Sequence, residues 1–297
     1  MTDVVRSRQI EANGLTFAID ELGEGDSVAL CLHGFPECRH SWRAQLPALA
    51  AQGWRAVAPD LRGYGQSSRP KARGAYHLDH LVADAAALFD ALGARRRLLI
   101  AHDWGAVIAW AFALERARPL DGLVVMNVPH PAAYLAQLRR SSAQLAKSWY
   151  VLFFQLPWLP EALLGANHAR AIGDSFLRTA VDPACFTPRM IAHYRDNAAE
   201  PGALTAMINY YRANTTALQR WGPGKAPMVE APTLIEWGER DPFLALDLLD
   251  LHGDLVRDLT IQRFPDASHW VQQEAAEGVN AALVTWMGAK GLTSPAP

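Results

Sequence analysis

The sequence has few cysteines, no long apolar run and no surplus of positive charge. Its three cysteines, Cys31, Cys38 and Cys185, have neither paired nor metal-type spacing, so we expect no disulfide framework. No apolar run reaches the roughly 18 residues of a membrane-spanning helix, and residues 1–27 lack a signal-peptide core. Lys+Arg 28 against Asp+Glu 30 gives no excess for nucleic acid or an acidic membrane. We therefore expect a soluble, cytoplasmic protein with no nucleic-acid or membrane partner.

Short apolar strands alternate with helical patterns at both ends of the chain, which predicts an α/β fold with a mostly parallel central sheet flanked by helices. A hairpin is expected around Asn13-Gly14, followed by strands at residues 28–32, 55–59, 98–101, 122–128, 233–238 and 259–264. Helices are expected at 41–51, with a kink or restart at Pro47, and at 78–92, 106–114 and 275–287.

The middle of the chain has helical periodicity, many aromatic residues and no evident strand. We interpret it as an all-helical lid inserted into one α/β domain. The expected division is a first core part at residues 1–129, a lid at 130–224 and a second core part at 225–297.

The most informative stretch is the end of the predicted strand at 98–101, where His102-Asp103-Trp104-Gly105 leads into a helix. Strand, tight turn and helix with small flanking residues form the frame of a nucleophile elbow, and Asp103 occupies the usual serine position. Serine attack on a saturated carbon would leave an ether, whereas a carboxylate leaves an ester that water can open. The motif therefore favours epoxide opening or carbon–halogen cleavage over an ordinary helix-capping aspartate.

Two further loops supply partners for this nucleophile. His269 follows the last predicted strand and is the expected general base, and Asp241 follows the preceding strand as the acid that orients it. The order nucleophile, acid, histidine matches α/β-hydrolases. Asp266 is the weaker alternative acid. The backbone N–H groups of Phe35 and Trp104 are the expected oxyanion donors.

Five motifs together resemble the α/β-hydrolase-fold epoxide hydrolases, over nearly the whole chain and in the right order. They are residues 33–36, 63–67, 102–105, 238–241 and 268–270. The resemblance implies an α/β-hydrolase fold and an enzyme that converts epoxides to vicinal diols through an alkyl ester on Asp103, which water activated by His269 hydrolyses. It implies a small-molecule epoxide as substrate and no metal or organic cofactor.

The resemblance also implies two lid tyrosines that hold the epoxide oxygen. Tyr150 lies in a segment similar to Tyr-x-x-x-Phe-Gln, and Tyr211 lies in a segment similar to Asn-Trp-Tyr-Arg. Tyr210 stands in the tryptophan position of that motif and is expected to pack. The phenol of a tyrosine, with its pKa near 10, can donate a hydrogen bond to the oxygen as the ring opens.

The sequence leaves two other functions open. A haloalkane or haloacid dehalogenase would use the same aspartate, and Trp104 is compatible with it, but Phe35 stands where haloalkane dehalogenases usually have an asparagine. A non-catalytic binder on this fold would be expected to lack a catalytic residue, and none is missing. Whether the protein forms a homodimer is also left open.

Three remaining features receive structural interpretations. The pattern of His77 and His80 with Asp84 could lie on one side of a helix, but it lacks a further ligand. We therefore expect these residues to belong to the surface rather than to bind a metal. His102 is expected to be a structural, hydrogen-bonded histidine. The aromatic residues of the lid are expected to form its core and the pocket wall rather than a partner-binding stripe: Trp149, Phe153, Phe154 and Trp158.

Overall fold

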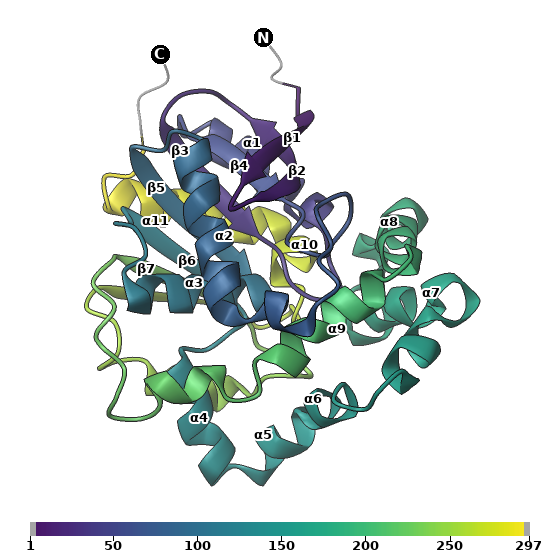
Figure 1. The fold of residues 1–297 in the computed structure, drawn as a ribbon. Helices are drawn as coiled ribbons and strands as arrows, with labels where there is room; N and C mark the ends of the chain where they lie inside the picture. Colours follow the sequence, from purple (N-terminus) through teal and green to yellow (C-terminus); the bar gives the residue numbers. More distant parts are fainter. Residues whose placement is uncertain (1–3, 294–297) are drawn as a thin grey trace.

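Figure 1 shows the computed structural model, which describes residues 4–293. Its centre is an eight-stranded sheet with the order β1-β2-β4-β3-β5-β6-β7-β8. The strands are β1 (Arg6–Ala12), β2 (Leu15–Leu22), β3 (Ser27–Leu32), β4 (Arg55–Pro59), β5 (Arg96–His102), β6 (Gly122–Met126), β7 (Thr233–Gly238) and β8 (Leu259–Phe264). β2 pairs antiparallel with β1 and β4, and all other pairs are parallel. The predicted fold class is confirmed.

The hairpin between β1 and β2 turns at Asn13 and Gly14, whose φ angles of 49° and 70° are both left-handed. Two left-handed residues in a two-residue loop suit the twist of the strands that they join, which explains why this dipeptide marks the turn.

The inner strands are mostly apolar because helices cover both faces of the sheet, although β7 also carries the fully buried Glu236. Along β3 the side chains alternate: Leu30 and Leu32 pack on the face covered by α2 (Leu78–Ala91) and α3 (Trp104–Glu115). Cys31 packs on the opposite face, which α1 (Gln45–Ala50) and α11 (Ala276–Ala289) cover. Trp286 of α11 and Trp42, in the turn before α1, pack there.

Two predicted boundaries were wrong. The helix expected at 41–51 is a 3-10 turn, η1 (Arg39–Trp42), followed by α1, and the break precedes Gln45. Pro47 lies in the first turn of α1, where its missing N–H costs nothing, so it does not kink the helix. β6 ends at Met126, because Asn127 turns the chain with a φ of 47°.

Between β6 and β7 the described chain contains helices and no strand of the sheet. These are α4 (Pro131–Arg140), α5 (Ser142–Lys147), α6 (Trp149–Phe153), α7 (Leu159–Thr179), η3 (Pro183–Cys185), α8 (Pro188–Ala199), α9 (Ala203–Ala213) and η4 (Ala217–Trp221). Figure 1 shows them gathered together beside the sheet. The expectation of an all-helical lid is confirmed as part of the fold class.

The remaining helical segments follow the core strands: η2 (Arg73–Tyr76), η5 (Leu246–Leu251) and α10 (Val271–Glu274). Over residues 4–293, no helix has the length and hydrophobicity needed to span a membrane.

Candidate active site

Asp103 lies in a strained turn between β5 and α3. Its φ of 48° and ψ of −122° lie outside the usual regions for a residue with a side chain. The turn is packed closely: a Cβ at Gly105 would lie 2.1 Å from the carbonyl oxygen of Leu32, and one at Gly34 would lie 2.3 Å from the Asp103 side chain. The Asp103 side chain makes no capping hydrogen bond to α3. The helix-capping alternative is therefore wrong.

The turn after β3 directs a backbone donor at this carboxylate. The N–H of Phe35 donates to Asp103 Oδ1 over 2.6 Å, and the peptide bond between Phe35 and Pro36 is cis. Trp104 begins α3, and the first N–H groups of a helix have no partner within the helix. These are the two N–H groups that the sequence analysis predicts as oxyanion donors.

His269 lies between two carboxylates. Its Nδ1 is 2.7 Å from Asp241 Oδ2, and its Nε2 is 3.5 Å from Asp103 Oδ2. The structure thus brings together the three side chains nominated as nucleophile, base and acid. Asp266, the alternative acid, is exposed and pairs with Arg240 at 2.8 Å.

The acid is held in place by donors that the sequence analysis did not identify. The N–H groups of Phe243 and Leu244 donate to Asp241 Oδ1 over 2.7 and 2.9 Å, and Asn127 Nδ2 donates to Oδ2 over 2.8 Å. Asn127 Oδ1 also accepts from the N–H of Gly238 at the end of β7. The left-handed turn that ends β6 therefore aims the Asn127 amide at the acid.

The charges of these groups depend on one another. Burial alone would lower the pKa of His269, but the carboxylates of Asp241 and Asp103 outweigh it and raise the pKa to about 10. Burial alone would raise the pKa of both carboxyls, and the hydrogen bonds and charge of His269 instead hold both below the usual value. At neutral pH the resting site therefore contains an imidazolium between two carboxylates, and Asp103 is ionised.

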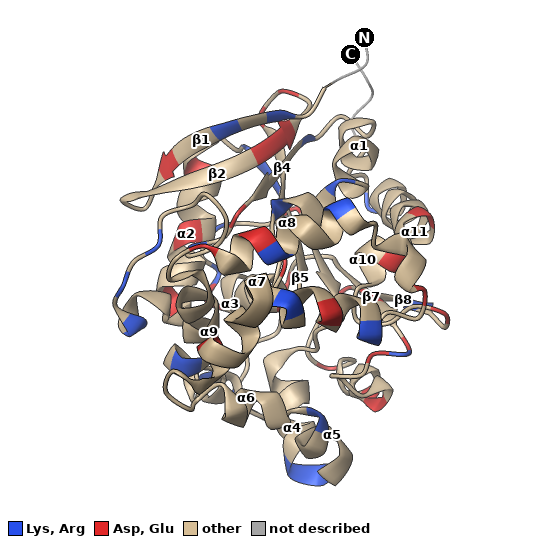
Figure 2. Ribbon diagram, turned by 90° about the vertical axis from the view of Figure 1, so that its right-hand side faces the viewer, with Lys and Arg blue, Asp and Glu red and all other residues tan. Residues whose placement is uncertain are grey.

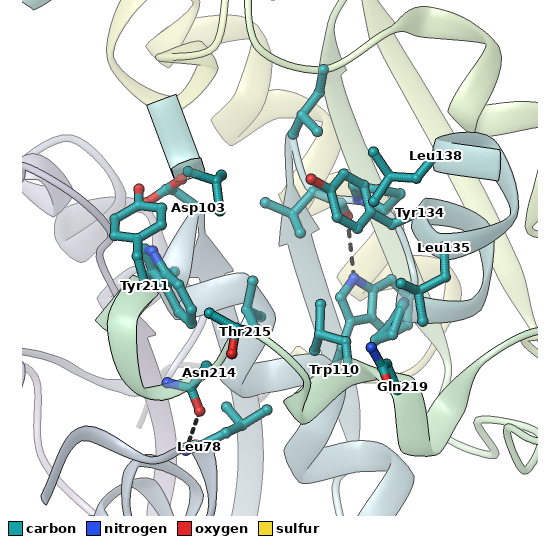
Figure 3. Close-up of a pocket in the computed structure, with 18 of the residues that line it drawn as sticks. Leu78, Asp103, Trp110, Tyr134, Leu135, Leu138, Tyr211, Asn214, Thr215 and Gln219 are labelled. Carbon is teal, nitrogen blue, oxygen red and sulfur yellow. Dashed lines mark hydrogen bonds between the residues drawn. The ribbon is translucent and has the colours of Figure 1, made fainter. Parts of the chain in front are cut away.

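Asp103, Tyr150 and Tyr211 line two apolar cavities. One, of about 240 Å³, runs along α3 towards α4 and η4, where Leu135, Leu138 and Leu218 form much of its wall. Figure 3 shows this cavity, with the phenol of Tyr211 beside the carboxylate of Asp103. The other, of about 220 Å³, runs towards α6 and α7 and is lined mostly by aromatic and aliphatic side chains: Phe35, Trp149, Phe153, Phe154, Leu164, Ile172, Phe243 and Trp270.

The two nominated tyrosines come from different lid helices, α6 and α9, and their ring centroids lie 5.9 Å apart. Burial raises the pKa of each, and the negative charge of Asp103 adds to the effect. Both phenols therefore keep their protons at neutral pH and can donate hydrogen bonds. Tyr210 packs elsewhere and donates to the carbonyl oxygen of Arg62 over 2.7 Å.

A buried hydrogen-bond network behind the site joins the turn after β3, the turn at Asp103 and the loop that carries His269. Glu37, fully buried, accepts from His102 Nδ1 at 2.7 Å and from the amides of Gln272 and Gln273 at 2.8 Å each. His102 Nε2 lies 2.8 Å from the carbonyl oxygen of His269. His102 is a structural, hydrogen-bonded residue, and no sequence pattern pointed to its partner Glu37.

The lid helix α5 contacts the loop that follows β7 and carries Asp241, which we call the acid loop, through two side chains. Gln144, which is fully buried, donates to the carbonyl oxygen of Phe243 over 3.0 Å and accepts from the N–H of Ala245 over 2.9 Å. Lys147 Nζ donates to the carbonyl oxygen of Asp241 over 2.8 Å. The loop that carries the acid is therefore anchored to the lid as well as to the sheet.

Within residues 4–293, no group of three His, Cys, Asp or Glu side chains is placed to hold a metal ion. His77 lies 3.3 Å from Asp79, whereas Asp84 is turned towards Arg62, with two oxygen–nitrogen distances of 2.6 and 2.7 Å.

Comparisons with known proteins agree with this geometry. The family model of the α/β-hydrolase fold matches residues 29–276. Epoxide hydrolase 4 of Homo sapiens is 37% identical over 287 residues, covering 94% of this chain and 77% of its own. Epoxide hydrolase A of Mycobacterium tuberculosis is 31% identical, covering 94% of this chain and 96% of its own.

Solved structures give the same result. An epoxide hydrolase of Bacillus megaterium, in complex with an inhibitor, superposes with a TM-score of 0.86 at 29% identity, covering 95% of this chain and all of its own. An epoxide hydrolase of Vigna radiata superposes with a TM-score of 0.80 at 31% identity, covering 96% of this chain and 98% of its own. The chain belongs to the α/β-hydrolase-fold epoxide hydrolases.

Proposed function

We propose that this protein hydrolyses epoxides to vicinal diols in two covalent steps centred on Asp103. The observation that carries the proposal is the position of the Asp103 carboxylate, which has the His269–Asp241 pair on one side and two apolar cavities lined by Tyr150 and Tyr211 on the other. A serine hydrolase would carry a hydroxyl at this turn, where Asp103 stands.

In the first step the carboxylate opens the ring. Asp103 Oδ1 accepts from the Phe35 N–H, so Oδ2 is the attacking atom. It forms a bond to one ring carbon while the bond from that carbon to the epoxide oxygen breaks, and the oxygen takes a proton from Tyr150 or Tyr211. The phenolate left behind takes the proton of the His269 imidazolium, because the ester on Asp103 no longer carries the charge that raised the pKa of His269. The buried phenols stabilise the developing negative charge because no water competes for it in the apolar cavity.

In the second step water opens the ester. His269 removes a proton from water, whose oxygen attacks the Asp103 carboxyl carbon, and the Phe35 and Trp104 N–H groups stabilise the charge on Oδ1. Collapse breaks the bond from the carboxyl carbon to Oδ2, and the departing alkoxide takes the proton from His269. The diol thus carries away Oδ2, and the Asp103 carboxyl is rebuilt with an oxygen from water. Its proton passes to His269, which restores the carboxylate and the imidazolium of the resting site.

The organisation of the chain around this site is also part of the proposal. We propose that residues 130–224 act as the lid between core parts at 1–129 and 225–297, which the start of α4 at Pro131 and the end of η4 at Trp221 support. A cytoplasmic location is supported by the unpaired thiols of Cys31, Cys38 and Cys185.

The test is to incubate the protein and its Asp103→Asn variant with a panel of epoxides and haloalkanes and to measure diol and halide separately. We expect diol formation by the parent and none by the variant. A His269→Gln variant should accumulate an alkyl ester on Asp103, detectable by mass spectrometry, while an Asp266→Asn control should turn over normally. Halide release without diol formation would instead assign the protein to the dehalogenases.

A further inference from the structure

The lid exposes an unusual amount of apolar side chain. Of the twelve large hydrophobic residues that are exposed within residues 4–293, six lie between positions 145 and 163. We call these six the lid face: Leu145, Trp149, Leu152, Leu156, Trp158 and Leu163. Leu152 and Trp158 are each 72% exposed. The expectation that Trp158 belongs to the lid core or pocket wall was wrong, since it lines neither cavity.

The first part of the lid face has helical spacing. Leu145, Trp149 and Leu152 are separated by four and three residues along α5 and α6, so they lie on one side of these consecutive helices. Such a stripe ordinarily faces a protein core, yet here it faces outward. Contiguous exposed apolar side chains of this kind mark a surface that meets another apolar phase.

The chain segment that carries most of the lid face has basic residues and no acidic ones. Between Asp121 and Glu161 the chain has no acidic residue, and it carries Arg139, Arg140 and Lys147. Figure 2 shows these helices, α4–α6, with blue segments and no red ones. Arg139 and Arg140 are exposed and, within the described chain, form no ion pair. The acid that ends the stretch, Glu161, is paired with Arg212 at 3.0 Å. Acidic charge near the segment comes from another element, since Asp247 of η5 accepts from Gln137 of α4 over 2.5 Å. Of the basic residues, Lys147 is turned inward to the carbonyl oxygen of Asp241.

The lid face is continuous with the substrate cavity. Trp149 is 63% exposed and also lines the cavity that runs from Asp103 towards α6 and α7. Trp149 therefore belongs both to the lid face and to the wall of this apolar cavity.

We propose, contrary to the expectation of no membrane partner drawn from the overall charge, that the lid face docks on the surface of a bilayer that contains anionic lipid. Tryptophan and leucine side chains at the headgroup boundary, flanked by arginine and lysine, are the composition of interfacial membrane-binding helices. A second copy of the chain is less favoured, because a two-fold contact through this face would gather Arg139 and Arg140 of both copies near one interface, and the segment 122–160 of neither copy has an acidic residue to pair with them. The substrate class follows if the proposed function holds: lipophilic epoxides that partition into the bilayer.

The test is co-sedimentation of the full-length protein with liposomes of phosphatidylcholine alone and with phosphatidylglycerol added. We expect binding to the anionic liposomes, weakened by salt. The variant Leu145→Ser/Leu152→Ser/Trp158→Ser should bind at least about tenfold more weakly, because each large apolar side chain buried in the interface contributes favourably. A matched control, Leu177→Ser/Met228→Ser/Ile261→Ser, removes three exposed hydrophobic residues elsewhere and should bind as the parent does.

Two further measurements keep the result independent of catalysis. Binding is measured in the Asp103→Asn background too, where it should be unchanged, and diol formation from a water-soluble epoxide should be the same in the lid-face variant as in the parent. Equal binding to both kinds of liposome, or binding that survives the lid-face substitutions, would overturn the proposal. So would a dimer, detected by light scattering, that the lid-face variant dissociates.

Discussion

Replacing Asp103 by asparagine removes one of the two negative charges that face His269. The distance from His269 Nε2 to Asp103 Oδ2 is 3.5 Å, and the His269 side chain is almost fully buried. At an effective dielectric constant of about 20, a pair of unit charges at this separation interacts by about 5 kcal/mol. Since 1.36 kcal/mol corresponds to about one pKa unit, the loss amounts to roughly three units.

The sign follows from the charges. An anion beside an imidazolium stabilises the protonated form, so its removal lowers the pKa of His269 from about 10 towards neutrality. The Asp241 carboxylate remains at 2.7 Å and keeps the pKa from falling as far as burial alone would take it. Esterification neutralises Asp103 in the same way, so the histidine would become an unprotonated base at the step that requires one.

The assay is an NMR pH titration of the protein labelled with ¹⁵N at histidine. The signal of His269 is assigned by its absence in a His269→Gln variant, since the chain has ten histidines. Asp266→Asn is the matched control, because that carboxylate is exposed and already paired with Arg240. A pKa near 10 in the Asp103→Asn variant would refute the electrostatic coupling on which the proposed second step depends.

Three other predictions test separate parts of the structure. Tyr150→Phe or Tyr211→Phe should slow ester formation by about 10- to 100-fold, the value of a hydrogen bond to a charged group, while ester hydrolysis measured by rapid quench stays unchanged; equal rates of ester formation would contradict their role. Gly34→Ala should leave the circular dichroism unchanged but lower kcat by about 100-fold or more, because the new Cβ would lie 2.3 Å from the nucleophile's side chain. His252 has its pKa lowered by burial to about 4, so the folded state binds fewer protons than the unfolded state; its contribution to the free energy of unfolding should be present above about pH 6.5 and be lost towards pH 4. Urea titrations should show a smaller loss over this interval in His252→Gln, and an identical loss would argue against it.

The strands and the elbow could be predicted from the sequence because their physical causes are local. A parallel strand covered on both faces is mostly apolar, so β6 and the middle of β5, residues 98–101, each appear as a short uninterrupted apolar run. The nucleophile elbow can also be recognised in the sequence, because the tight turn tolerates only small residues beside it, such as Gly105. The ends of neighbouring parallel strands meet at one edge of the sheet, which is why His269 and Asp241 could be assigned from position alone.

The supporting residues could not be predicted, because their partners are distant in the sequence and their residue types carry no periodic signal. Glu37 and His102 are 65 positions apart, and Asn127 and Asp241 are 114 positions apart. Gln144 bonds to the backbone of the acid loop, where any residue type could supply the partner atoms. Only the fold brings these groups within hydrogen-bond distance.

The lid marks a different limit of sequence reasoning. The spacing of Leu145, Trp149 and Leu152 is that of a buried helical face, and periodicity predicts burial without knowing what lies opposite. In the structure other residues of α5 and α6 face the protein. Gln144 of α5 bonds to the acid loop, and Tyr150 of α6 lines the cavity. The polar residue Gln144 therefore faces inward, and the apolar stripe faces outward. An inverted pattern of this kind requires the inward polar groups to be hydrogen-bonded, as Gln144 is, and it leaves the outward stripe available to the bilayer proposed above.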